Sequence, residues 1–131
     1  MTALKRTLAA MVAAAIALYV GVWMLLGPAV IQVENDLPYE IRSIEVSGDG
    51  FNKRIARLGP GESRCVRPSG IHAESGLEFR AETDAGRIEA TDLAYLEASG
   101  GYHVIIEVSP GPHVRASNDG SVWMALCGLW R

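Results

Sequence analysis

The chain has 131 residues, of which 12 are basic and 15 acidic. All 15 acidic residues but only 10 of the basic ones follow Leu26, so this larger part carries a net charge of −5 and gives no reason to expect nucleic-acid binding. Without the apolar N-terminus about 100 residues remain, which is enough for one small domain and excludes a second.

The uncharged stretch from Leu8 to Leu26 predicts a single transmembrane helix. As a helix it would span roughly 28 Å, close to the hydrocarbon thickness of a bilayer. Lys5 and Arg6 precede it, whereas the next basic residue, Arg42, follows three acidic ones. The positive-inside rule therefore places the N-terminus in the cytoplasm. We predict a cytoplasmic N-terminus and membrane span in residues 1–28, and an extracytoplasmic domain in residues 29–131.

Two other interpretations of this stretch stay open, a cleaved signal peptide and the core helix of a soluble protein. Gly27-Pro28-Ala29 has the small-x-small pattern of a cleavage site, although the apolar length exceeds that of an ordinary signal core. An uncleaved helix also carries small residues at every fourth position, a spacing that would let a second copy approach closely and form a homodimer. These residues are Ala9, Ala13, Ala17 and Gly21.

Beyond the span the chain consists of short β-prone runs separated by Gly, Pro, Asn and Asp. Strands are expected at residues 29–34, 39–47, 51–58 and 63–66. In the second strand Ile44 and Val46 share a face but Ile41 is out of phase, which predicts a bulge near Arg42-Ser43 or a late strand start. Gly48-Asp49-Gly50 predicts a hairpin turn, because Gly and Asp tolerate positive backbone angles.

The second half shows its clearest strand pattern from Leu77 to Glu82, where apolar and charged residues alternate. Further strands are expected at residues 87–90, 102–109, 114–116 and 121–130. Residues 93–97 fit either a continued strand or one helical turn. In the strand at residues 102–109, we expect Tyr102, Val104, Ile106 and Val108 to face the core.

Seven to nine short strands with frequent turns, and no helical stripe of useful length, predict an all-β domain. We expect a small antiparallel β-sandwich, immunoglobulin-like in the loose sense, preceded by the one N-terminal helix. A small barrel is the alternative, because periodicity does not distinguish the two.

Cys65 and Cys127 are the only cysteines, and both follow the predicted span. Outside the cytoplasm disulfides persist, so we expect these two to form a bridge within the chain. A covalent dimer through them is the alternative.

No motif in the sequence indicates catalysis. G-x-S-x-G is absent, Gly48-Asp49-Gly50 lacks the spacing of a P-loop, and Gly59-x-Gly61 lacks the third glycine of a dinucleotide fold. We expect no enzyme activity and no cofactor.

A metal site would need His72, His103, His113 and the two cysteines to converge in space. Their spacing shows no H-x-H or C-x-x-C, so surface histidines and a structural disulfide are the favoured interpretation. We therefore assign no metal ligands.

Two other features are candidates for an interaction surface. Five basic residues lie within a short stretch, Lys53, Arg54, Arg57, Arg64 and Arg67, and would suit anionic headgroups or an acidic partner. Such charges more often cover the solvated faces of edge strands.

The run from Val122 to Trp130 is uncharged and contains Trp123 and Trp130. A strand there would be apolar on both faces, so it must be buried or rest against a lipid interface or a protein. We expect Trp123 to face inward with Cys127 and Trp130 to be the more exposed ring.

These features favour a non-catalytic protein with one membrane span, whose extracytoplasmic β-domain contacts another envelope or membrane protein. The alternative is an extracytoplasmic domain that binds a small ligand or a metal. The architecture resembles many small single-span envelope proteins, a resemblance that carries no function.

Overall fold

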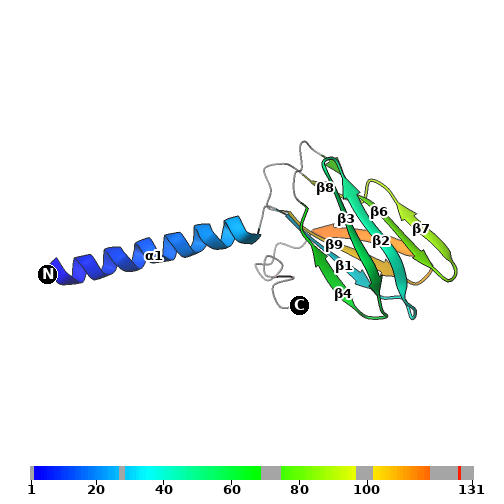
Figure 1. The fold of residues 1–131 in the computed structure, drawn as a ribbon, viewed down its shortest axis with the longest axis horizontal. Coiled ribbons are helices and arrows are strands. Elements are labelled where there is room, and N and C mark those ends of the chain that lie inside the picture. Colours follow the sequence, from blue (N-terminus) through cyan, green and yellow to red (C-terminus); the bar gives the residue numbers. More distant parts are fainter. Residues whose placement is uncertain (1, 27–28, 69–74, 97–101, 119–126, 128–131) are drawn as a thin grey trace.

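The computed structural model of the protein describes residues 2–26, 29–68, 75–96, 102–118 and 127. Within these ranges one N-terminal helix is followed by strands in several sheets (Figure 1). The expectation of a mostly β protein with one apolar N-terminal helix is therefore confirmed.

Helix α1 (Thr2–Leu26) contains a 20-residue stretch, Ala3–Val22, that is long and apolar enough to cross a membrane. None of this stretch is buried against the rest of the described protein. A core helix would be covered by the sheets, so that interpretation is wrong. A signal sequence near the N-terminus meets the same criterion of length and composition.

Eight of the strands form two four-stranded sheets. The first sheet has the order β10-β9-β1-β4 and contains β1 (Ala29–Asn35), β4 (Ser63–Val66), β9 (Tyr102–Ser109) and β10 (His113–Asn118). The second sheet has the order β3-β2-β6-β7 and contains β2 (Ile41–Gly48), β3 (Phe51–Leu58), β6 (Glu78–Thr83) and β7 (Gly86–Ala90). The short strands β5 (Ser75–Gly76) and β8 (Tyr95–Leu96) pair with each other.

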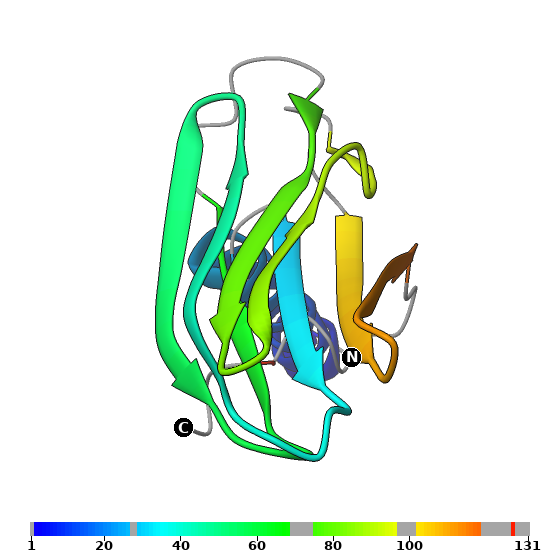
Figure 2. The same cartoon turned by 90° about the vertical axis from the view of Figure 1, so that its right-hand side faces the viewer.

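One hydrophobic core receives residues from both four-stranded sheets. From the first sheet come Ile31, Val33, Val104, Ile106 and Val108, all of them fully buried. From the second come Ile41, Ile44, Val46, Ile55, Leu58, Phe79, Ala81 and Ile88. The expected inward face of the 102–109 strand is confirmed at its three described core positions. Figure 2 shows β3 and β10 at opposite sides of the β-domain.

Strand β2 contains the predicted bulge. The register between β2 and β6 shifts between Arg42 and Glu45, and Ser43 has a φ of 49°. Because the extra residue changes which face the strand presents, Ile41 and Ile44 both reach the core despite their odd spacing. The two-residue turn after Gly48 follows as expected, with Gly50 at a φ of 85°.

Asn35 ties the end of β1 to the end of β3. The side chain is fully buried, and Nδ2 donates hydrogen bonds to the carbonyl oxygens of Leu58 and Gly59 at 3.0 Å. Asn35 Oδ1 accepts a hydrogen bond from the Leu37 N–H, also at 3.0 Å. These contacts place the Asn35 end of the first sheet beside the Leu58 end of the second.

The expectation of wholly antiparallel sheets is wrong in one place. Strands β1 and β9 pair in parallel, from Ala29 opposite Tyr102 to Asn35 opposite Val108. A parallel pair requires a long crossover, and here the chain passes through the second sheet before it returns as β9. Of the segment 93–97 the structure describes residues 93–96, which include the two-residue strand β8, and the expected strand at 121–130 lies outside the described residues apart from Cys127.

Candidate functional site

The basic cluster lies on two strands at the outside of their sheets. Strand β3 is the outer strand of the second sheet, and β4 is the outer strand of the first, among the strands that the structure describes. A short connection, residues 59–62, joins them. Four of the five cations lie on these two strands, and Arg67 directly follows β4. We call the two strands, together with Arg67, the β3–β4 edge.

Its five cations differ in their contacts. Arg54 Nε lies 3.9 Å from Glu45 Oε2, and Arg67 donates a hydrogen bond to the carbonyl oxygen of Cys127 at 2.9 Å. Among the described residues, no ion pair involves Lys53, Arg57 or Arg64. Lys53 is half-buried, and the other two are exposed. Three positive charges thus stand on the β3–β4 edge without a described counter-charge.

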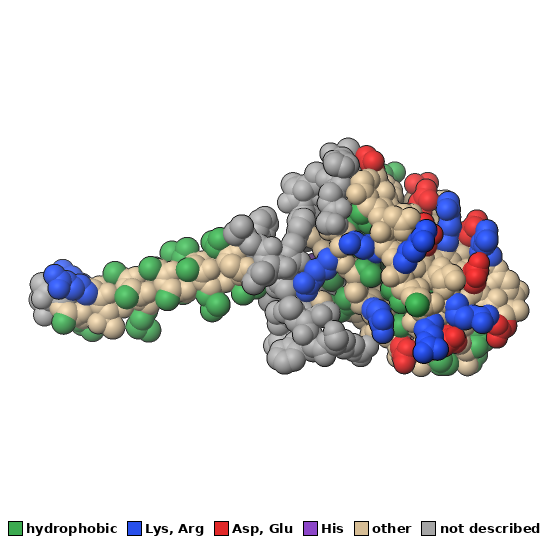
Figure 3. Space-filling view, viewed as in Figure 1, with side chains coloured by type: hydrophobic (Ala, Val, Ile, Leu, Met, Phe, Trp, Pro, Cys, Tyr) green, Lys and Arg blue, Asp and Glu red, His purple; other side chains and the backbone are tan. Residues whose placement is uncertain are grey.

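The outer face of the second sheet is charged but internally paired. Arg42 pairs with Asp84, Arg80 with Glu78, and Arg87 with both Glu82 and Glu89. All of these side chains are well exposed, so each pair contributes little to stability, yet together they neutralise this face. Figure 3 shows basic and acidic side chains intermixed over this part of the domain. The β3–β4 edge differs because part of its charge is not neutralised.

The bulge opens a polar hollow of about 230 Å³ on this paired face. It is lined by Ser43, Glu45, Arg80, Ala81, Glu82 and Arg87. The sequence did not predict this hollow, because the bulge was its only local signal and the lining residues come from three separate strands. Acidic and basic side chains both line the hollow, so their charges neutralise one another. The lining therefore does not indicate a particular class of ligand.

Cys65 and Cys127 lie at disulfide distance, with 5.9 Å between their Cα atoms and a sequence separation of 62. Cys65 pairs with Gln32 across β4 and β1, whereas the neighbouring pair Val66 and Ile31 faces the core. The cysteine pair therefore lies on the outer face of the first sheet. Gln32 Oε1 lies 3.4 Å from Cys127 Sγ and 3.9 Å from Cys65 Sγ.

This position changes the interpretation of the C-terminal run. We expected a bridge from Cys65 to draw the Cys127 face inward, and Trp123 with it. Cys65 and Gln32 share the outward side of the sheet and only the alternate residues reach the core, so a bridge from Cys65 leads to the outer face of the first sheet. Trp123 and Trp130 themselves lie outside the described residues, so their exposure stays a prediction.

The histidines do not converge in the described part of the chain. His103 and His113 belong to the same sheet, but His113 pairs with Ser109, six residues along β9 from His103, which is roughly 20 Å in a strand. His72 lies outside the described residues. In the ranges that the structure describes, no three His, Cys, Asp or Glu residues are placed to hold a metal ion.

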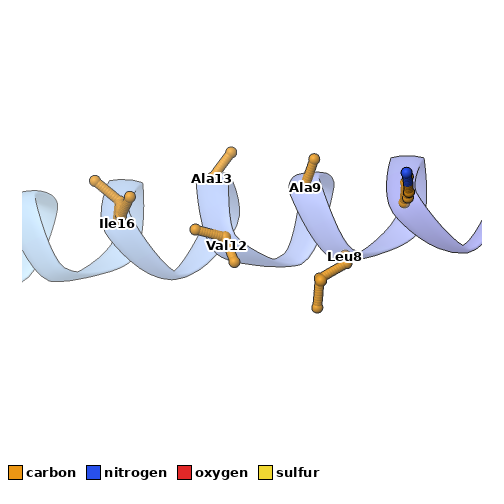
Figure 4. A pocket seen from close by; sticks show the side chains of 6 residues that line it. Leu8, Ala9, Val12, Ala13 and Ile16 are labelled. Carbon is orange, nitrogen blue, oxygen red and sulfur yellow. The ribbon is translucent and has the colours of Figure 1, made fainter.

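Helix α1 has a shallow hollow of about 420 Å³ beside its small residues. Figure 4 shows Ala9 and Ala13 on one edge of the helix and Leu8 on the other, with Val12 between them. Gly21 lies about two helical turns beyond Ala13 on the same side of the helix, and it has open space around it. These residues are therefore available for a second helix, and none of them contacts the β-domain.

No family model matches the chain, and no curated protein matches it. A solved structure that is similar is the NMR structure of a protein from Eubacterium rectale, at 17% identity and a TM-score of 0.47. The match covers 72% of this chain and 90% of that chain. At this level the likeness carries no argument about function.

Proposed function

We propose that the protein is a non-catalytic membrane-anchored module, whose extracytoplasmic β-domain contacts an acidic surface of another envelope or membrane protein. The β3–β4 edge is the contact surface. Helix α1 is an uncleaved anchor with its N-terminus in the cytoplasm, and the two four-stranded sheets form a β-sandwich that is immunoglobulin-like in the loose sense. The shared core of the two sheets supports this last assignment.

The membrane anchor is supported by the length and exposure of α1. Its apolar stretch Ala3–Val22 has no partner surface within the described protein, and burying such a stretch in lipid removes its apolar side chains from water. The position of Cys65 and Cys127 at disulfide distance suits an oxidising compartment. Both observations agree with a β-domain outside the cytoplasm.

One observation carries the assignment of the contact surface, the three cations of the β3–β4 edge that have no described counter-charge. Lys53, Arg57 and Arg64 lie on strands that are outermost in their sheets among the strands that the structure describes. A partner with acidic side chains would neutralise these three cations. An acidic partner would gain less electrostatic attraction at the outer face of the second sheet, because the charges there already pair with one another.

Site-specific photo-crosslinking tests this surface in cells that express the full chain. A crosslinking residue replaces Ala56, which is exposed on β3, or Ala85, which is exposed in the turn between β6 and β7 as the matched control. We expect a discrete protein adduct from position 56 and none from position 85. Equal adducts from both positions would contradict a defined contact at the β3–β4 edge.

Charge reversal sharpens the same experiment. Arg57→Glu should lower the adduct yield at position 56 by about tenfold, because a like charge would then face the acidic partner. Arg80→Glu is the control, since Arg80 is a cation of the paired face. A similar loss in both variants would mean that overall charge, and not the β3–β4 edge, governs the contact.

A further inference from the structure

The link between helix and domain restricts which end of the β-domain faces the bilayer. Helix α1 ends at Leu26 and β1 begins at Ala29, so three peptide steps join them. Fully extended, these steps reach about 11 Å. The start of β1 therefore stays close to the last helical residue whatever angle the helix takes.

Register and hydrogen bonds show what else lies at this end. Tyr102 at the start of β9 pairs with Ala29, and the chain comes to Tyr102 directly from β8. At the opposite end Asn35 binds the carbonyl oxygen of Leu58, so β3 starts at the Ala29 end. The turn before β3 is joined to β5, and β5 pairs with β8. Figure 1 shows β8 and the β2–β3 turn toward the side of the domain from which the helix extends.

Tyr95 on β8 is the most exposed large apolar side chain of the described β-domain, at 66%. Its neighbour Leu96 is fully buried and holds the short strand in place. The residue opposite Tyr95 is Gly76, which has no side chain to cover the ring. Exposed tyrosine is favoured at a membrane interface, where the ring meets the acyl boundary and the hydroxyl meets water.

Among the described residues, the charged side chains at this end include one cation and two carboxylates. Lys53 lies near the start of β3, the exposed Asp49 lies in the turn before β3, and the exposed Asp92 lies just before β8. A cation alone would favour anionic lipid, but two nearby carboxylates oppose that attraction. The aromatic ring is therefore the feature of this end that favours lipid.

We propose that this end of the β-domain rests in the headgroup layer of the bilayer that α1 crosses, with Tyr95 inserted among neutral, zwitterionic headgroups. The inference rests on the membrane anchor of the proposed function. It adds a fixed orientation, because contact at Tyr95 and the short link together hold the domain at two points. Arg57, near the far end of β3, then faces away from the bilayer, where a partner protein reaches it.

Depth-dependent fluorescence quenching tests this orientation with the full chain in phosphatidylcholine vesicles. A fluorophore is attached to an introduced cysteine at Tyr95 or, as the matched control, at Tyr39, an exposed tyrosine whose carbonyl is bound by Asn35 at the opposite end. The oxidised wild-type chain, labelled in parallel, gives the background. We expect phosphatidylcholine spin-labelled at its headgroup to quench position 95 at least about threefold more than position 39.

A second label at Asp49→Cys, in the turn at the same end, should be quenched more than position 39 as well, and it guards against a local effect of replacing Tyr95. Equal quenching at positions 95 and 39, in protein that floats with the vesicles, would overturn the orientation while leaving the anchor intact. Protein that does not float would overturn the anchor and this inference together. Quenching at position 95 that appears only with anionic lipid would overturn the role of the tyrosine.

The vesicles contain no other protein, so this result is independent of the partner proposed above. If photo-crosslinking at position 56 fails while the fluorophore at position 95 is quenched, the partner surface alone is rejected. Conversely, a protein adduct at position 95 in cells, without quenching in vesicles, would assign this end to a protein and reject the lipid contact.

Discussion

At the scale of single residues, Asn35 is a fully buried polar side chain whose hydrogen bonds connect the ends of β1 and β3. Asn35→Ala removes donors to three carbonyl groups, those of Tyr39, Leu58 and Gly59, and the acceptor for the Leu37 N–H. Buried backbone groups would lose partners, so we expect the free energy of unfolding to fall by about 3 kcal/mol. Urea denaturation of the full chain in detergent, followed by circular dichroism, measures the change.

Asn52→Ala is the matched control for this substitution. Asn52 is exposed on β3, and its side chain donates a hydrogen bond to the half-buried Glu45 carboxylate, so its loss should stay within about 0.5 kcal/mol. Similar losses in both variants would show that the buried network at Asn35 is not a special source of stability.

At the scale of elements, the bulge in β2 depends on the positive φ of Ser43. Ser43→Val places a β-branched side chain at a φ of 49°, which is strongly disfavoured, and should destabilise the protein by about 1 to 2 kcal/mol. Ser43→Gly should be tolerated because glycine adopts this angle freely. Ser47→Val, on the same strand beyond the bulge, is the control. An equal loss at positions 43 and 47 would argue against backbone strain as the cause.

The link between β4 and the C-terminal part of the chain is a second prediction at this scale. A bridge between Cys65 and Cys127 closes a loop of 62 residues, which loop-entropy arithmetic values at about 4 kcal/mol. We expect no free thiol on alkylation and mass analysis of native protein, and a marked fall in the unfolding midpoint after reduction. Two free thiols would refute the bridge, and a dimer released by reductant would replace it with a covalent link between chains.

At the scale of the whole molecule, charge at one end of α1 predicts the position of the β-domain relative to the membrane. Lys5 and Arg6 precede the uncharged run from Leu8 to Leu26, so a reporter that is active only outside the cytoplasm should work when fused after Arg131. Retention of an N-terminal tag on the mature protein would show that α1 is not cleaved. Activity of a cytoplasmic reporter alone at this position would reverse the proposed topology.

The helix, the short strands and the turns could be predicted from the sequence because their causes are local. An uncharged run of helical length stops at Gly27-Pro28, and the observed helix ends at Leu26. The bounds of β3 and β4 agree with the sequence expectation, since turn residues flank each of them. The odd spacing of Ile41 and Ile44 marked the bulge because each strand must keep its apolar residues on one face.

The candidate site was predicted only in its residue types. Five cations were visible in the sequence, but only the ion pairs of the structure separate Lys53, Arg57 and Arg64 from Arg54. The exposure of Tyr95 was not predicted, because a two-residue strand leaves no periodic pattern.

Tertiary structure alone decided the relations between distant segments. The parallel pairing of β1 with β9, the adjacency of β3 and β4 at the edges of different sheets, and the outward position of Cys65 all depend on which strands meet. The packing of the whole core selects which strands pair. Its free energy depends on residues that are far apart in the sequence, so a short sequence segment does not reveal it. The sequence by itself determined the apolar N-terminal helix, the bounds of β3 and β4 and the turns, because short-range sterics and side-chain periodicity act within a few residues.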